Sequence, residues 1–172
     1  MSEPSGEAQR RHVGPVMHTC HVTLDIVVAT GPNLEDWRTI HNRIIPTDPL
    51  SAHDIAELST RHRLTLALAN DQAVGNATVR PPRKPDAAVT VIVRILPEYR
   101  RNGYGSTYLH AELAQARALG ARRIETVVLA SNTESLAFAR VYGFVEHDRY
   151  TLDGDAIPFV YLHLAQSQPH RA

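Results

Sequence analysis

The feature that most constrains the fold is a strand, a glycine-containing loop and a helix that follow one another in the middle of the chain. Residues 88–95 (AVTVIVRI) are rich in β-branched side chains and predict a well-buried strand. Pro97 ends this strand, and the loop 100–105 (RRNGYG) follows it. Beyond the loop, a helix is predicted whose inner face carries Leu109, Leu113 and Ala116, with Gly120 as a left-handed cap.

Such a loop is a recurring solution for binding phosphate. The free N–H groups at the start of a helix point at the anion, and the helix dipole favours its negative charge. We expect Gly103 and Gly105 to allow close backbone approach and to adopt positive φ, while Arg100 and Arg101 add cationic donors. For the two glycines alone, a helix start that merely needs glycine remains an equal alternative.

Two better-known phosphate loops do not fit. A P-loop requires a Gly-Lys pair, and the sequence contains none. A dinucleotide-binding fingerprint requires a third glycine where Tyr108 stands, and its acidic residue would have to be Glu125, which falls at the beginning of its predicted strand rather than at the end.

The rest of the chain supplies further strands and helices around this segment. The pattern predicts helices over 34–44, over 51–63 and from Asn132 or Thr133 to Gly143. It predicts strands over 21–29, 64–69, 73–80, 124–130, 144–152 and 159–164. A hairpin turn is expected at 70–72, a loop at the prolines of 81–86 and a turn at 153–155. The order is therefore β-α-α-β-β-β-α-β-α-β-β. It predicts a single-domain α/β (α+β) fold, with a mixed sheet of about seven strands flanked by about four helices.

Composition narrows the function classes. The 172 residues suit one domain, and 18 basic residues balance 18 acidic ones, so the basic excess typical of nucleic-acid-binding proteins is missing. No apolar run is long enough to span a membrane, no secretory signal is recognised, and Cys20 has no partner for a disulfide. We expect a cytoplasmic protein with a disordered lead-in over 1–20, a domain over 21–164 and a flexible tail over 165–172.

The 10 histidines raise the question of a metal site. Two of them fall in the tails, His18 and His21 flank the lead-in, and the others are scattered through different predicted elements. No HxxxH or HExxH spacing occurs, so we predict no metal.

Two motifs together resemble those of the GNAT N-acetyltransferases. The run from Ile95 to Gly105 resembles the family's pyrophosphate motif, [RQ]-x-x-G-x-[GA], with its preceding buried strand and proline. Downstream, Asn132 is followed eleven and twelve residues later by Gly143-Phe144, which is similar to the family's second signature. The element order fits the family over about residues 21–164.

The resemblance implies direct transfer of an acetyl group from acetyl-CoA to an amine. Carried over position by position, the backbone of Val93 and Ile95 would pair with the pantetheine arm, because the fourth and fifth strands of the family splay apart. An amide near Ile95 could also stabilise the oxyanion on the thioester. Asn132 would contact the cofactor near its thiol. The pyrophosphate would be held by Arg100, Arg101, Asn102, Gly103, Tyr104, Gly105 and Ser106.

One departure concerns the acid that protonates the leaving thiolate. Many family members have a tyrosine seven residues after the asparagine, where this chain has Ala139. Tyr142 lies one helical turn further on, and packing beside Phe144 is its expected role. The general base stays unassigned among Glu125, His110, Asp153 and Asp155, and Glu98 and Glu112 are expected on a solvated face.

Two functions remain open. As an enzyme, the chain would acetylate a small molecule, which we favour, or a peptide or lysine amine, in a site walled by residues 41–51 and by the hairpin at 153–155. As a binding module, it would be a non-catalytic or weakly catalytic acyl-CoA sensor or subunit, which would explain Ala139. No nucleic acid or membrane partner is expected, and a homodimer remains open because family members are often dimers.

Overall fold

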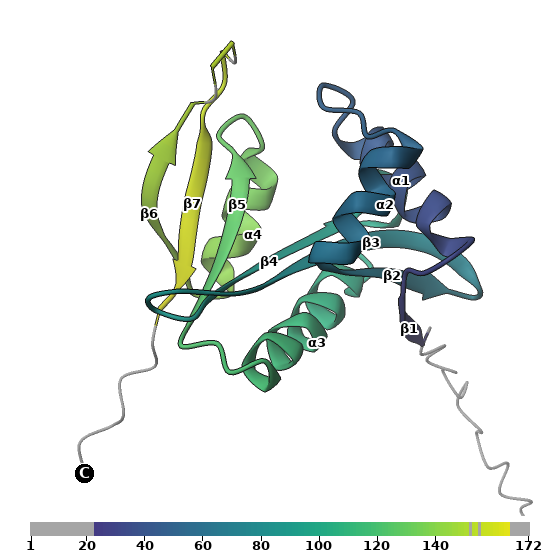
Figure 1. The fold of residues 1–172 in the computed structure, drawn as a ribbon, viewed down its shortest axis with the longest axis horizontal. Coiled ribbons are helices and arrows are strands. Elements are labelled where there is room, and N and C mark those ends of the chain that lie inside the picture. Colours follow the sequence, from purple (N-terminus) through teal and green to yellow (C-terminus); the bar gives the residue numbers. More distant parts are fainter. Residues whose placement is uncertain (1–22, 152, 155, 166–172) are drawn as a thin grey trace, which may run out of the picture.

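The computed structural model describes residues 23–151, 153–154 and 156–165. The predicted element order is confirmed, with one additional short 3₁₀ helix after the fourth strand (Figure 1). The predicted lead-in over 1–20, Cys20 and most of the predicted tail lie outside the described residues. The elements are β1 (Leu24–Val28), α1 (Asn33–Ile44), α2 (Ala52–Arg61), β2 (Arg63–Ala69), β3 (Gln72–Arg83), β4 (Ala88–Ile95), η1 (Pro97–Tyr99), α3 (Tyr104–Ala118), β5 (Arg123–Leu129), α4 (Thr133–Val141), β6 (Phe144–Tyr150) and β7 (Phe159–Leu164).

All seven strands form one mixed sheet in the order β1-β2-β3-β4-β5-β7-β6. Neighbouring strands are antiparallel, except that β4 and β5 run parallel. The last strand, β7, inserts between β5 and β6, so the two closing strands pair with each other inside this chain and β6 forms the edge. The fold is therefore the predicted single mixed-sheet domain.

The two faces of the sheet are covered by different helices (Figure 1). On one face, α3 and α4 bury Leu109, Leu113 and Leu136 against strand residues such as Val91 and Val160. On the other face, α1 and α2 pack over the half of the sheet formed by β1 to β3. Their core is built from Trp37, Ile40, Ile55, Leu64 and Leu66.

The parallel pair β4 and β5 is joined over only a short stretch. Residues Ala88 to Thr90 pair with Arg123 to Glu125, and the register stops there. Beyond Thr90 the two strands diverge, and Figure 1 shows β5, β7 and β6 swinging away from the half of the sheet that α1 and α2 cover. This divergence confirms the splayed strands that the family resemblance implied.

Local sequence signals explain how the helices begin. The Ser51 side chain accepts a hydrogen bond from the amide of Asp54, whose carboxylate accepts one from the amide of Ser51, which completes the predicted capping box of α2. Asn132 accepts from the amide of Ser135 and caps α4. Gly120 adopts φ +81° just beyond α3, as predicted for a left-handed cap.

The loop predicted at residues 81–86 is wrong at its start. Strand β3 continues through Pro81 and Pro82 to Arg83, which pairs with Ala88. The register shifts between Arg80 and Arg83, so the two prolines sit in an irregularity where no ladder N–H is required of them. The two prolines therefore lie within this strand instead of ending it.

The prediction of a solvated Glu112 is also wrong. Its side chain is 1% exposed on the inner face of α3. The carboxylate accepts hydrogen bonds from Arg63 Nη1 at 2.7 Å and from Thr65 Oγ1 at 2.6 Å, and the Thr65 hydroxyl is also bonded to that of Tyr108. Arg63 and Thr65 belong to β2, about 50 residues away in the sequence, and no local sequence pattern reveals contacts over that separation. Glu98 is exposed, as predicted, and pairs with Arg43.

Gly75 of β3 allows β3 and β4 to approach closely at the end of β4 that leads into the loop 100–105. A Cβ at this position would lie 2.4 Å from the carbonyl oxygen of Arg94 and 2.6 Å from Ile95 Cδ1. We expect Gly75→Val to lower the free energy of unfolding by about 2–3 kcal/mol, because a backbone carbonyl cannot move aside as a side chain can.

Urea unfolding measures this effect, with Gly105→Ala as the control. A Cβ at Gly105 would meet Phe138 at 3.5 Å, an ordinary contact. We therefore expect the control to keep its stability. Equal stability of Gly75→Val and the unsubstituted protein would contradict the close approach.

Candidate functional site

The first part of the candidate site is the free edge of β4. The amide of Leu96 donates to the carbonyl of Val74 on β3 at 2.9 Å. Because backbone groups alternate in direction along an antiparallel strand, those of Val93 and Ile95 point to the opposite edge, toward β5. Since β5 pairs with β4 only as far as Thr90, these groups face a strand that has diverged. The edge can accept an extended ligand by strand addition.

The second part is the loop that follows β4. Gly103 is the N-cap of α3 and adopts φ +80°, and Arg101 adopts φ +65°. Within the described part of the chain, the amides of residues 101–106 have no backbone acceptor, whereas the next amide, of Thr107, donates to the Gly103 carbonyl. A row of free N–H groups at a helix N-terminus is suited to an anion.

Gly105 differs from the expectation of a positive φ. It lies inside the first turn of α3, and its φ is not in the left-handed region. A Cβ there would contact Phe138 of α4 and Ile95 of β4, so the position is closely flanked without being blocked. The left-handed conformation is provided by Arg101 and Gly103 instead.

Two hydrogen bonds of the Arg100 side chain anchor the loop. Its Nε donates to the carbonyl of Ile95 at 3.1 Å, and its Nη1 donates to Glu134 in the first turn of α4 at 2.8 Å. The neighbouring Asn102 side chain donates to the carbonyls of Tyr99 and Arg100, while the Arg101 residue is exposed. Arg100 thus connects the end of β4 with the start of α4.

The second sequence signature lies beside this loop. Ala139 is 5% exposed and belongs to the core, so no side chain there reaches the diverging strands. The Tyr142 hydroxyl donates to Ser106 Oγ at 2.5 Å, and its ring contacts those of Phe138 and His110. Tyr142 packs against the core cluster that contains Phe144, as expected, and also braces the first turn of α3.

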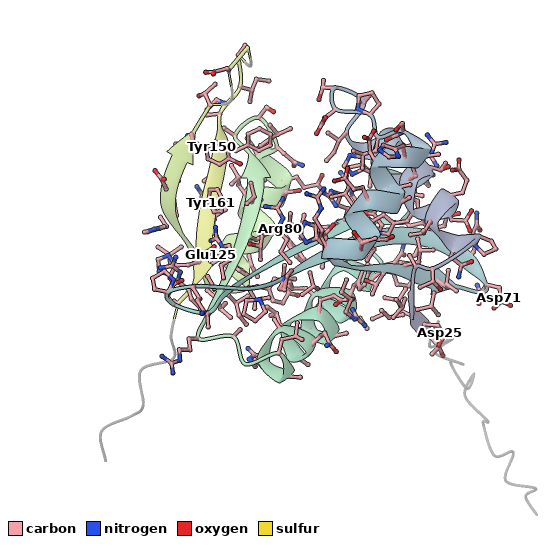
Figure 2. The ribbon with its side chains drawn as sticks, in the orientation of Figure 1. Asp25, Asp71, Arg80, Glu125, Tyr150 and Tyr161 are labelled. Atoms are coloured by element: carbon pink, nitrogen blue, oxygen red, sulfur yellow. The ribbon has the colours of Figure 1, made fainter. Side chains whose placement is uncertain are left out.

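The third part of the site is the sheet face opposite α3. Asn76 bonds to Trp37 of α1 and therefore lies on the α1 side of β3. Arg80 shares that face because side chains alternate along a strand, and Arg94 lies directly across from Asn76. Figure 2 shows Arg80 between this half of the sheet and the diverging strands, which carry Glu125, Tyr150 and Tyr161. Neither arginine belongs to a motif that is recognisable in the sequence.

Charge and burial shift several pKa values on this face. Burial, and less strongly the nearby charge of Arg80, lower the pKa of Arg94 to about 10. Burial also lowers the pKa values of His41 and His62, reinforced by Arg94 and Arg80 respectively. Burial raises the pKa of Tyr150. The face is therefore positively charged, with neutral imidazoles at pH 7.

The candidate bases are placed differently from one another. Glu125 is buried on the same face as Arg80, but its carboxylate is held by Arg83 and Arg123, both at 2.6 Å. His110 is exposed on α3, with Nδ1 at 2.8 Å from the Ser106 carbonyl. Asp153 lies in the exposed turn between β6 and β7, and Asp155 lies outside the described residues. None of the acids and histidines described in the structure cluster in a way that could hold a metal ion.

The Acetyltransferase (GNAT) family matches residues 33–144. A search of curated proteins gave no match. None of the helices in the described ranges is long and apolar enough to cross a membrane.

Many solved structures share the fold. A protein assigned as a phosphinothricin N-acetyltransferase superposes with a TM-score of 0.74 at 23% identity, over 85% of this chain and 100% of that one. Naa50 of Arabidopsis thaliana, in complex with the bisubstrate analogue CoA-Ac-MVNAL, gives 0.71 at 20% identity, over 84% and 100%. yncA of Salmonella typhimurium, with its cofactor acetyl-CoA, gives 0.69 at 17% identity, over 87% and 96%. With the family match over residues 33–144, the chain belongs to the GNAT family of acetyltransferases.

Proposed function

We propose that the chain is an N-acetyltransferase that moves an acetyl group from acetyl-CoA to a primary amine. The observation that carries this proposal is the continuity between the free edge of β4 and the unpaired amides of residues 101–106. A ligand bound along both would be an extended chain attached to a pyrophosphate, which is the chemistry of CoA. We place this activity in a domain over residues 21–164.

The donor would be held mainly by the backbone. The amides of residues 101–106, with the N-terminal dipole of α3, would bind the pyrophosphate, helped by the exposed Arg101 side chain. The pantetheine arm would extend along β4 as an added strand and pair with Val93 and with the amide of Ile95, whose carbonyl already accepts a hydrogen bond from Arg100. Asn132 would lie near the thiol, where α4 begins beside the diverging strands.

The transfer itself is a direct displacement. The neutral amine attacks the thioester carbonyl, and an N–H of the β4 edge near Ile95 stabilises the oxyanion that forms. The C–S bond then breaks while the newly formed C–N bond remains. The nitrogen loses a proton, and the sulfur gains one. Because a thiol has a pKa of about 8.5, its thiolate leaves without obligatory help from an acid. Ala139 is therefore compatible with catalysis, with water as the proton source.

Related structures support a donor of this kind. The Salmonella protein carries acetyl-CoA, and the Arabidopsis protein carries a CoA group joined through an acetyl to a peptide. The phosphinothricin N-acetyltransferase assignment concerns a small amine, whereas the Arabidopsis ligand concerns a peptide. We favour a small-molecule acceptor.

The alternative is a protein that binds acyl-CoA and turns it over slowly or not at all. Ala139 favours it, because general acid help is worth on the order of 10² to 10⁴ in rate. As a subunit or sensor, the chain would use the same edge and loop. A homodimer would be compatible with either function.

Thiol release from acetyl-CoA, measured over a panel of amines, tests the proposal. We expect one or more primary amines to raise the rate well above hydrolysis in buffer, with the acetylated amine detected by mass. Thermal stabilisation by CoA without turnover on any amine would instead establish the binding function. Neither turnover nor stabilisation would contradict both.

A further inference from the structure

Unpaired polar atoms gather at one place in the molecule. Six buried side-chain nitrogen or oxygen atoms lack a hydrogen-bond partner among the described residues. Five of these belong to residues on or beside the sheet face that Arg80 and Arg94 share. They are His41 Nδ1, His62 Nδ1, Asn76 Oδ1, Arg80 Nε and Arg94 Nη1.

Both arginines on this face lack a counter-ion in the described part of the chain. Among residues 23–151, 153–154 and 156–165, ten ion pairs are formed, and none of them involves Arg80 or Arg94. The buried carboxylate of Glu125, on the same face, is already shared between Arg83 and Arg123. The two histidines beside the arginines have lowered pKa values, and a histidine cannot act as a counter-ion to an arginine.

This arrangement is costly in the free protein. Arg80 and Arg94 are half-buried residues, each with one buried nitrogen that has no acceptor among the described residues. A buried donor without an acceptor loses its hydration without compensation, and the two like charges repel each other. The lowered pKa of Arg94, at about 10, reflects both effects. An apolar side chain in either position would remove the cost. Two arginines that stay charged here without a counter-ion are suited to binding an anionic ligand.

The arginines also lie next to the proposed path of the donor. Arg94 is between Val93 and Ile95, whose backbone groups face the free edge of β4, and its own side chain points to the sheet face opposite α3. Across the diverging strands, the ring centroids of Tyr150 and Tyr161 lie 5.3 Å apart, and Arg80 is close enough to Tyr150 to act on its pKa. An amine that accepts the acetyl group on this face would have aromatic rings on one side and guanidinium groups on the other.

We propose that the acceptor is an amine that also carries an oxyanion, a carboxylate or a phosphonate-type group, and that Arg80 and Arg94 bind this oxyanion. The inference rests on the proposed acetyl transfer and specifies its acceptor. The anion accepts from Arg80 Nε and Arg94 Nη1, which lack partners among the described residues, and it places the amine beside the reacting end of the donor. Arginine suits both groups because its planar donors match the geometry of carboxylate and phosphonate oxygens.

Matched amines test the proposal with the full chain and acetyl-CoA. The set is ethylamine, alanine, β-alanine and 2-aminoethylphosphonate, which differ in the presence, position and kind of the anion. We expect kcat/KM for at least one anionic amine to exceed that of ethylamine by about 10- to 100-fold, the range of one or two charged hydrogen bonds. Arg80→Gln and Arg94→Gln should each remove most of this preference. Arg61→Gln, at an exposed position on α2, should keep it.

A binding measurement makes the test independent of turnover. With CoA present, calorimetry with inorganic phosphate should show binding to the unsubstituted protein and to Arg61→Gln, and no binding to the double variant Arg80→Gln/Arg94→Gln. Binding that needs both arginines would support the anion site even if no amine were acetylated, which would contradict the proposed transfer alone. Equal kcat/KM for all four amines, together with phosphate binding that ignores both arginines or is absent, would overturn the inference and leave acetyl transfer standing.

Discussion

Gly103→Val should weaken the binding of acetyl-CoA by about 10- to 100-fold. Gly103 has φ +80°, a conformation that a β-branched residue avoids at a cost of about 1–3 kcal/mol. The loop would relax into another conformation, and the amides of residues 101–106 would no longer converge on one anion. Each 1.4 kcal/mol lost from binding is a factor of ten in Kd, which sets the expected range. Isothermal titration with acetyl-CoA measures the change.

Gly120→Val is the matched control for this experiment. Gly120 has φ +81°, so valine meets a similar backbone strain at both positions. At both glycines a Cβ would meet nothing within 4 Å, so a steric clash of the Cβ contributes to neither effect. Gly120 follows the other end of α3, away from the loop. We expect both variants to lose similar stability, and only Gly103→Val to lose affinity. Equal affinity of the two variants would mean that the loop does not hold the donor.

Glu112→Ala should lower the free energy of unfolding substantially, although Glu112 lies outside the candidate site. The carboxylate is buried and accepts from Arg63 and Thr65, so its removal leaves a charge and a hydroxyl without their acceptor. Breaking a buried pair in this way costs about 3–5 kcal/mol, and we expect about 2–4 kcal/mol because Arg63 is partly exposed and can turn toward water. Urea unfolding monitored by circular dichroism measures it.

The control for this prediction is Glu98→Ala. Glu98 also forms an ion pair with an arginine, but the side chains of Glu98 and Arg43 are 45% and 54% exposed. Exposed pairs contribute about 0–1 kcal/mol, so the control should unfold close to the unsubstituted protein. If both glutamates had the same small effect, the network of Arg63, Thr65 and Tyr108 would not stabilise the fold as described.

Much of the fold could be predicted because its signals are local. The capping residues Ser51 and Asn132, the glycine after α3 and the β-branched run of β4 each fix an element through contacts within a few residues. The strand, loop and helix of the candidate site are also contiguous in sequence. The family resemblance then supplied the splayed strands, which no local pattern indicates.

The features that sequence could not give depend on which strands become neighbours. Arg80 and Arg94 share one face only because β3 pairs with β4 in a particular register. Glu112 is buried because Arg63 and Thr65 of β2 lie under α3. The positive φ expected of Gly105 failed for a different reason: the residue lies one position inside the helix, where the backbone is regular, and Arg101 takes the left-handed conformation instead.

Amide hydrogen exchange with and without acetyl-CoA tests the proposed donor site most directly. We predict that acetyl-CoA slows exchange at the amides of residues 101–106 and at Val93 and Ile95, because these N–H groups lack acceptors in the free protein or face the diverged strand. The main competing surface is a basic pocket lined by Arg117, Arg122, Arg123 and His163. Protection there, with none at the loop and at the β4 edge, would contradict the account.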